Sequence, residues 1–157
     1  MLFYMAVYVV MTLGAFLCVL RMRRQDGEPT EVIYALTGLS QTRPALAAAF
    51  AIFMFSLAGI PPLFGFWPKL LVFWAAVDAG LVALAVAGIV GTVIGAYYYL
   101  KIVKIMYFDA PGEPMGRVSQ PIEGALIALA AIAVSPLGYL LIGPLQSLSD
   151  RAAGSIF

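Results

Sequence analysis

Residues 56–69, with the sequence SLAGIPPLFGFWPK, decide how the rest of this chain folds. The stretch holds three prolines and two glycines, ends in a lysine, and has long apolar sequence on both sides. Proline and glycine disfavour an undisturbed helix here, and an ionisable side chain embedded in a bilayer is costly enough to mark a functional site. The stretch therefore predicts a broken helix beside a functional Lys69. The residues of the predicted break are Gly59, Pro61, Pro62, Gly65 and Pro68.

The composition assigns the chain to the membrane proteins. Of its 157 residues, 63% are hydrophobic and 11% are charged, whereas a soluble domain is about half apolar and about a quarter charged. We expect an all-α fold, a polytopic transmembrane helical bundle that forms a single domain over residues 1–157. The formal net charge of +1 gives no electrostatic reason to expect nucleic acid as a partner.

The few reactive side chains limit the chemistry available to the chain. Cys18 is the one cysteine and there is no histidine, so the sequence predicts no internal disulfide, no metal site and no bound cofactor. Without histidine, the usual proton carrier near neutral pH, any proton transfer falls to lysine and carboxylate groups.

Apolar length predicts five membrane spans, since about 20 residues cross the hydrocarbon core and shorter helices suffice where the chain is broken. We place them at residues 1–20, 44–59, 61–78, 81–106 and 122–145, with turns at 59–62 and 78–80. An odd number of spans puts the two termini on opposite faces of the membrane. Residues 31–39 form either a short surface helix or an ordered loop.

Two placements of Lys69 follow from different positions of the helix break. In a helix that begins at Pro61, Lys69 lies about eight residues in, roughly 12 Å along the axis and near mid-membrane. If one helix runs from Pro44 to Phe66, Lys69 is instead an interfacial anchor whose charge reaches the water. A helix that starts at Pro68 puts Lys69 in its first turn, where burial and the positive end of the dipole both disfavour the ammonium form. Such a lysine can relay protons.

Other features of the apolar segments are read as structural. The segment 97–104, YYYLKIVK, is typical of a membrane–water interface, and Ser135–Pro136 predicts a kink in the last span. Gly88, Gly91 and Gly95, with Thr92 nearby, lie on one face and favour close packing of another helix. Asp78 is interpreted as a turn residue beside Gly80. The basic residues leave the orientation undecided, four against three on the two sides: Arg21, Arg23, Arg24 and Arg43 against Lys101, Lys104 and Arg117.

Three segments together carry a resemblance to a known family. They are YVVMTLGAF at 8–16, SLAGIPP at 56–62 followed by Phe66 and Lys69, and YYYLKIVKIMYF at 97–108. The chain resembles the carboxyl-terminal third of the antiporter-like subunit N family of bacterial respiratory complex I, the NADH–quinone oxidoreductase. One position departs from the family, which usually has glycine where this chain has Pro68.

The resemblance implies a proton-translocating subunit of 14 helices in two inverted repeats, of which this chain would contain helices ten to fourteen. Lys69 matches the lysine of the broken twelfth helix, so the resemblance favours the buried placement and the role of proton relay. The family's glutamate on helix five and lysine on helix seven would lie upstream. The resemblance also puts the loop at 109–121 in the cytoplasm and the tail in the periplasm.

The function expected from this resemblance is proton translocation through Lys69, coupled to quinone reduction elsewhere in the complex. The chain would be a multi-pass protein of the bacterial inner membrane, without a redox cofactor. Its partners would be the lipid bilayer, protons and the other membrane subunits of complex I, without which we expect it to be unstable. Two alternatives remain: a subunit of a multisubunit cation/proton antiporter, and a non-pumping structural module in which Lys69 pairs with a fixed carboxylate.

Overall fold

The structure, a computed structural model, describes residues 2–22, 33–111 and 121–141, and every regular element in these ranges is helical. The long helices are α1 (Leu2–Leu20), α3 (Pro44–Ala58), α4 (Phe66–Asp78), α5 (Val82–Phe108) and α6 (Pro121–Val134). Shorter pieces are α2 (Leu39–Thr42) and two 3₁₀ helices, Ile33–Leu36 and Pro136–Leu141. The all-α prediction is confirmed.

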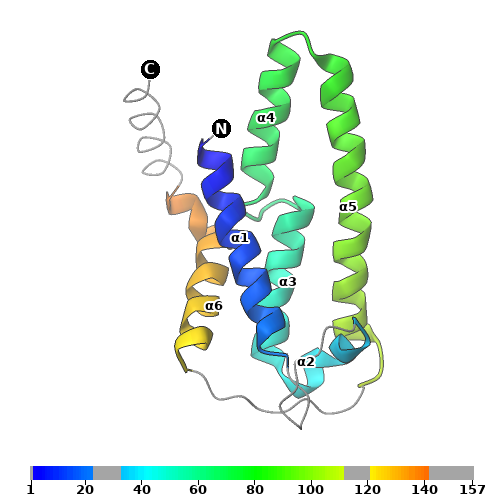
Figure 1. Ribbon diagram of the computed structural model, residues 1–157, viewed down its shortest axis with the longest axis vertical. Helices are drawn as coiled ribbons and strands as arrows, with labels where there is room; N and C mark the ends of the chain where they lie inside the picture. The colour runs from blue at the N-terminus through cyan, green and yellow to red at the C-terminus, as the bar shows by residue number, and fades with distance from the viewer. Residues whose placement is uncertain (1, 23–32, 112–120, 142–157) are drawn as a thin grey trace.

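Helices α3 and α4 follow one another end to end and point in the same direction (Figure 1). Helix α5 returns beside both of them, because its 27 residues extend about 40 Å at 1.5 Å per residue. Helices α1 and α6 pack against each other and against α3, whereas α4 packs mainly against α5. The bundle therefore has a closely packed body, and the α4–α5 hairpin projects from it.

This arrangement corrects the predicted course of the chain between residues 44 and 78. Two successive spans would reverse direction near Gly59, whereas α4 continues the path of α3. Helix α4 begins at Phe66 and not at 61, because Pro61 and Pro62 lie in turns. The alternative of one helix from Pro44 to Phe66 is also wrong, since α3 ends at Ala58, where Gly59 takes the left-handed conformation at φ 80°.

The end of the last predicted span differs as well. Helix α6 stops at Val134 and a 3₁₀ helix, Pro136–Leu141, follows it, because Pro136 cannot donate the next helical hydrogen bond. The predicted kink at Ser135–Pro136 is therefore a break, and residues 142–145 lie outside the described residues. Of the segment 31–39, residues 31 and 32 are also outside them. The remainder forms the 3₁₀ helix Ile33–Leu36 and the start of α2, and the Gly38 N–H donates to the Ile105 carbonyl at 3.2 Å.

Close packing of α1 on α3 fixes the centre of the body. The ring of Phe53 on α3 is completely buried and lies directly against Gly14 of α1. Met11 and Cys18, each about one turn from Gly14 on the same helix, are also buried. Glycine at position 14 lets the two helix backbones approach, as small residues do in membrane bundles.

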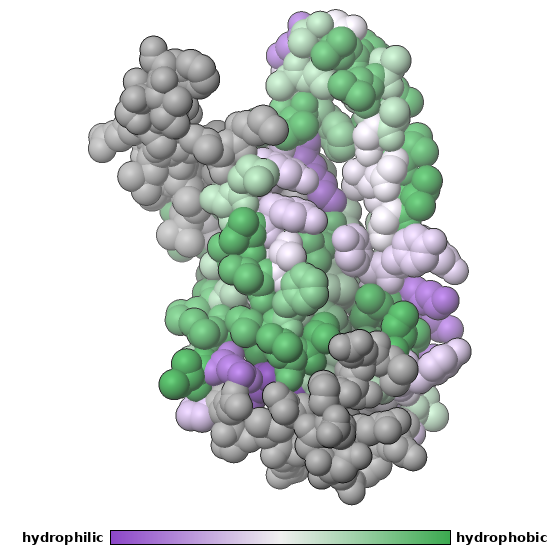
Figure 2. Space-filling view, viewed as in Figure 1, coloured by the Kyte–Doolittle hydropathy of each residue, from purple (hydrophilic) through white to green (hydrophobic). Residues whose placement is uncertain are grey.

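Apolar side chains are exposed over much of the projecting hairpin. Trp74 on α4 and Leu84 and Val93 on α5 are each more than 60% exposed, and Figure 2 shows hydrophobic residues over the tip and the outer side of the hairpin and in large patches on the body. By length and composition, α5 is the one helix of the described residues long and apolar enough to cross a membrane. The apolar helices Tyr4–Leu20, Pro44–Ala58 and Pro121–Val134 are shorter.

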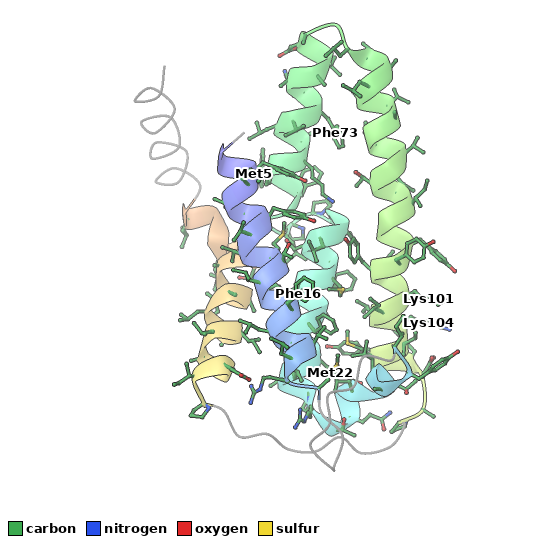
Figure 3. All side chains as sticks on the ribbon, in the orientation of Figure 1. Met5, Phe16, Met22, Phe73, Lys101 and Lys104 are labelled. Carbon is green, nitrogen blue, oxygen red and sulfur yellow. The ribbon has the colours of Figure 1, made fainter. Side chains whose placement is uncertain are left out.

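The described basic residues other than Lys69 gather at one end of the bundle. The end of α1, the start of α3 and the end of α5 meet there (Figure 1), and the Arg43 guanidinium donates to the Arg21 carbonyl at 3.0 Å. Lys101 and Lys104 lie near the same end of α5 (Figure 3). The predicted division of basic charge between two sides is wrong for these four residues, because it assumed a reversal near Gly59. Arg23, Arg24 and Arg117 lie outside the described residues.

Substituting Gly14 tests the contact between α1 and α3. A Cβ at position 14 would overlap the buried Phe53 ring, and overpacking of this kind costs about 1–3 kcal/mol. We expect Gly14→Ala to lower the melting temperature of the chain, assayed in mild detergent with the membrane proteins that co-purify with it. Gly91→Ala is the matched control, since no atom of the described residues outside its own helix backbone lies within 4 Å of its added Cβ. Equal melting temperatures for the two variants would contradict the packing described here.

Candidate functional site

The carboxyl end of α3 is closed by a glycine cap. The N–H of Gly59 donates to the Ser56 carbonyl at 2.9 Å, and the N–H of Ile60 donates to the Phe55 carbonyl at 3.1 Å. This pair of bonds is a Schellman motif, which requires a left-handed residue after the helix and therefore favours glycine. The cap satisfies two of the four carbonyls that every helix end leaves without an intrahelical partner.

The chain between the two helices leaves no backbone donor unpaired from Gly59 to Phe66. Pro61 and Pro62 have no N–H, and the N–H of Leu63 and of Phe66 donate to the carbonyls of Ile60 and Leu63 at 3.0 and 3.1 Å. Phe64 and Gly65 find acceptors on other helices: the Val134 carbonyl at 3.0 Å and the Ser56 hydroxyl at 2.9 Å. An interrupted helix is thus compatible with apolar surroundings, which demand that backbone polar groups be satisfied within the protein.

Ser56 joins the two sides of the break to α1. Its side chain is fully buried; the hydroxyl oxygen accepts the Gly65 N–H, and the hydroxyl donates to the Met11 sulfur at 3.0 Å. A Cβ on Gly65 would lie 2.7 Å from the Ser56 hydroxyl oxygen and 2.8 Å from that sulfur. Glycine is therefore required at position 65 by close approach, and the predicted role of Gly65 at the break is a packing role.

Lys69 is the fourth residue of α4 and reaches back to α3. Its Nζ donates to the Leu57 carbonyl at 2.6 Å, so a side chain closes a third carbonyl at the end of α3. The stem passes Gly59, where an added Cβ would lie 3.1 Å from Cδ of Lys69. The prediction that Lys69 lies eight residues into its helix is wrong, because α4 starts five residues later than expected.

Pro68 occupies the third position of α4 and is fully buried. The first four N–H groups of a helix have no intrahelical acceptor, so proline loses nothing there. Its ring would clash with a helical carbonyl at residue 64, and residue 64 is in fact outside the helix. Helix α4 therefore begins ahead of Pro68, and Lys69 still lies in the first turn.

Lys69 lies opposite the middle of α5. Thr92 of α5 lines one cavity together with Lys69. At helical rise it is about 15 Å from the Val82 end of α5 and about 24 Å from the Phe108 end. The other described Lys, Arg, Asp and Glu side chains belong to residues 21, 43, 78, 101, 104, 109 and 123, which lie at or near helix ends. Among the described residues, Lys69 is thus the one such side chain at mid-height.

A cavity of about 280 Å³ lies between α1, the α3–α4 break and α5, and Lys69 is part of its wall. Its lining residues are Tyr4, Tyr8, Met11, Leu57, Gly65, Pro68, Lys69, Gly88, Gly91, Thr92, Gly95 and Tyr99. Tyr4 and Tyr8 stack on each other with ring centroids 5.9 Å apart. Residues that carry hydroxyl groups and a lysine therefore line one hollow.

The glycine face of α5 borders this cavity. Gly88 lies under Phe73 of α4, labelled in Figure 3, with 2.7 Å from its added Cβ to the ring edge. No described atom comes within 4 Å of a Cβ at Gly91, and Gly95 meets only Tyr99 of its own helix at 3.9 Å. The predicted helix contact along this face is thus present at Gly88 and absent at the other two glycines in the described part of the chain.

No carboxylate among the described residues forms an ion pair with Lys69. Asp78 lies at the far end of α4, nine residues or about 13 Å along the helix, where it precedes the turn at Gly80. Sequence reasoning missed Ser56, although it is the one polar residue of α3 and that isolation was a usable signal. The prediction that this chain holds no metal or redox cofactor stays a prediction.

Comparison with known proteins places this geometry in a family. The family model for the NADH:quinone oxidoreductase/Mrp antiporter transmembrane region matches residues 1–95. NADH-quinone oxidoreductase subunit N of Rhizorhabdus wittichii is 65% identical over 98% of this chain and 32% of its own length. The subunit N of Sphingopyxis alaskensis is 55% identical, over 98% and 33%. The predicted resemblance to subunit N is confirmed, and the chain spans about a third of the length of these relatives.

Two solved structures have the same fold. A chain of respiratory complex I from Thermus thermophilus superposes with a TM-score of 0.77 at 35% identity, over 90% of this chain and 32% of that one. A chain of the Mrp complex from Dietzia superposes with a TM-score of 0.68 at 24% identity, over 91% and 35%. The second likeness concerns the fold alone.

Removing the Ser56 hydroxyl tests the break itself. Ser56→Ala leaves the buried Gly65 N–H without an acceptor, which costs about 1–3 kcal/mol. We expect a lower melting temperature in mild detergent and less chain in the membrane fraction. Thr37→Ala is the control, since its hydroxyl bond to the Tyr34 carbonyl is exposed and lies away from the break. Unchanged stability of Ser56→Ala would show that the break does not depend on this hydroxyl.

Proposed function

The chain belongs to the NADH:quinone oxidoreductase/Mrp antiporter family of transmembrane proteins, and from this premise we propose that it forms part of a proton-translocating membrane subunit of an NADH–quinone oxidoreductase. The carrying observation is the position of Lys69, at mid-height beside a helix break and on the wall of a cavity. In this proposal Lys69 relays protons, and the redox chemistry takes place in other subunits.

Two helix ends act on the Lys69 charge in opposite senses. The carboxyl end of α3 carries a partial negative charge, and the Leu57 carbonyl accepts from Nζ at 2.6 Å, so this end favours the ammonium form. The amino end of α4 carries a partial positive charge, and the apolar surroundings also oppose the charge. Opposed influences of this kind suit a group that gains and loses a proton during each cycle.

The cavity gives the ammonium group a route for its proton. Its 280 Å³ is many times the roughly 10–15 Å³ that one water needs, so several waters fit. Thr92 and Tyr99 on α5, with Tyr4 and Tyr8 on α1, line it, and in our proposal their hydroxyls are the polar partners that such waters need. In our proposal, protons reach or leave Lys69 through these waters.

The proposed membrane arrangement has four passages in place of the five predicted. Helix α5, about 40 Å long, exceeds the hydrocarbon thickness of about 30 Å, and α3 with α4 forms one discontinuous passage beside it. Helices α1 and α6 make the other two. The end with Arg21, Arg43, Lys101 and Lys104 faces the cytoplasm, because short cytoplasmic loops carry the excess of basic residues. The start of α1 and the end of α6 then share the periplasmic face of a bacterial inner membrane.

The proposed partners are lipid and other membrane subunits of the complex. The apolar faces of the hairpin, with Trp74, Leu84 and Val93 more than 60% exposed, need an apolar environment to cover them. Membrane subunits and acyl chains both supply one. We therefore keep the expectation that the chain is recovered in stable form only together with such subunits.

One observation supports a different function for Lys69. Its hydrogen bond to the Leu57 carbonyl closes the end of α3, which a purely structural lysine would also do. In that alternative the chain pumps nothing, and any permanently charged donor at position 69 would serve equally well. The remaining alternative is a subunit of a cation/proton antiporter. It differs from the proposed function because its transport would depend on sodium.

Substitution of Lys69 by arginine separates relay from cap. Guanidinium donates hydrogen bonds but stays protonated in proteins, so Lys69→Arg keeps a cap and removes the relay. We expect Lys69→Arg and Lys69→Met each to reduce proton pumping by about a hundredfold or more, the scale of a lost acid–base group. The measurement is proton uptake per NADH oxidised in inside-out membrane vesicles, at matched amounts of assembled complex.

The control for this experiment is Lys101→Arg, at an exposed lysine of α5 that we expect to tolerate the change. Wild-type pumping by Lys69→Arg, with pumping lost in Lys69→Met, would establish the cap alone. Pumping that requires sodium in the wild type would favour the antiporter.

Single cysteines test the four-passage arrangement. Cys18 is fully buried and should not react, whereas Gln41, Ala79 and Ala110 are exposed. Five passages would put Gln41 and Ala110 on opposite faces, whereas four put both on the cytoplasmic face. We expect a membrane-impermeant maleimide to label Ala79→Cys from the periplasm, and Gln41→Cys and Ala110→Cys only in inverted vesicles. Labelling of Gln41→Cys and Ala110→Cys from opposite sides would rule out the arrangement.

A further inference from the structure

Two helix breaks meet at one hydrogen bond. The N–H of Phe64, in the chain between α3 and α4, donates to the carbonyl of Val134 at 3.0 Å. Val134 is the last residue of α6 and directly precedes Ser135–Pro136. The two helices that stop inside the bundle are therefore joined to each other at their interruptions.

The Val134 carbonyl is available because α6 stops there. In a continuing helix it would accept the N–H of Gly138, four residues on. That N–H donates instead to the Ser135 carbonyl at 2.8 Å, three residues back. Pro136 enforces the change, since it has no N–H and its ring would clash with the Ile132 carbonyl. That carbonyl accepts from the Ser135 hydroxyl at 2.7 Å.

The junction is tightly packed. Val134 is 1% exposed and Phe64 is 3% exposed. Gly138, in the 3₁₀ helix after the break, has no room for a side chain, because an added Cβ would overlap the Ala133 carbonyl and approach the Phe64 ring to 3.4 Å. Movement of the end of α6 therefore has to move Phe64.

Phe64 is one residue from the segment that sets the start of α4. The next amide, that of Gly65, donates to the Ser56 hydroxyl on α3 at 2.9 Å, so consecutive amides are held by two different helices. Helix α4 begins at Phe66, and Lys69 follows Gly65 by four residues, about one helical turn. Its Nζ reaches the Leu57 carbonyl only while this start is kept in place.

We propose that the Ser135–Pro136 break of α6 is a positioning element for Lys69, and that Pro136 is the positioning residue. Pro136 frees the Val134 carbonyl, the Val134 carbonyl holds the Phe64 amide, and that amide with its neighbour fixes the turn of α4 that carries Lys69. The consequence for proton transfer rests on the proposed function above. The positioning of the Lys69 amine does not, and it is measured separately.

The test compares the reactivity of Lys69 in the assembled wild-type complex with its reactivity in complexes in which Pro136 is replaced. Pro136→Ala lets α6 continue, so that Gly138 takes the Val134 carbonyl and the Phe64 N–H loses its acceptor. The probe is acetic anhydride, which acylates neutral amines, with acetylation of Lys69 and Lys101 measured by mass spectrometry across pH. We expect the Lys69/Lys101 ratio to change by about fivefold, the scale of one intramolecular hydrogen bond.

Matched variants make the result specific. Pro136→Gly should give a smaller change in the same direction, because glycine still disfavours a continuing helix. Pro121→Ala, at the first position of the same helix, should leave the ratio unchanged. An unchanged Lys69/Lys101 acetylation ratio in Pro136→Ala would overturn the proposal. An equally large change in the Lys101/Lys104 acetylation ratio would also overturn it, because it would indicate a general loosening of the chain. If Pro136→Ala does not assemble, the comparison of Pro136→Gly with Pro121→Ala decides by the same criteria.

Proton pumping by the same vesicles separates this inference from the proposed function. We expect Pro136→Ala to pump fewer protons per NADH oxidised while Pro121→Ala pumps normally. Altered Lys69 reactivity with normal pumping in both Pro136→Ala and Lys69→Arg would leave the positioning intact and end the relay. Loss of pumping in Lys69→Arg with unchanged reactivity in Pro136→Ala would end the positioning alone.

Discussion

The requirement that no backbone polar group stay unpaired in apolar surroundings governs the rest of this structure. A helix interrupted inside the bundle exposes carbonyls at one end and N–H groups at the other, and each unpaired one costs about 1–3 kcal/mol. Six N–H groups from Gly59 to Phe66 are paired. Leaving them unpaired would cost an amount comparable to the whole stability of a typical domain, about 5–15 kcal/mol.

The partners that meet this requirement bring the distant parts of the chain together. Ser56 of α3 binds Gly65 and Met11, so the break is attached to α1. The Val134 carbonyl binds Phe64, so it is also attached to α6. With both amides held, α4 continues the direction of α3 beside α5 (Figure 1). The end-to-end course of α3 and α4 then brings the described basic residues other than Lys69 to one end.

Local signals predicted the parts of this arrangement that local chemistry decides. The composition predicted helices, and the proline and glycine pattern predicted the break and the lysine beside it. The direction of α4 was missed, because Pro61 and Pro62 read equally well as the first turn of a helix and as a loop. What separates these readings is whether the amides of Phe64 and Gly65 find acceptors on α6 and α3. No property of residues 61–65 themselves contains that information. The predicted division of basic residues between two sides was wrong for the same reason, because it depended on the direction of α4.

Closing a helix end and relaying a proton make different demands on Lys69, and the position of the cavity reconciles them. As an ammonium group, Lys69 gives the Leu57 carbonyl a charge-assisted hydrogen bond at 2.6 Å, which is stronger than a neutral one. In the proposed relay the amine then loses its proton, and the carbonyl needs another strong donor at that moment. Leu57 and Lys69 both line the cavity, so water there can serve the carbonyl while the amine is neutral. A sealed, dry break would leave the lysine no route by which to exchange its proton, whereas in the proposed relay a break open to water lets the same residue act as cap in one half of the cycle and as carrier in the other.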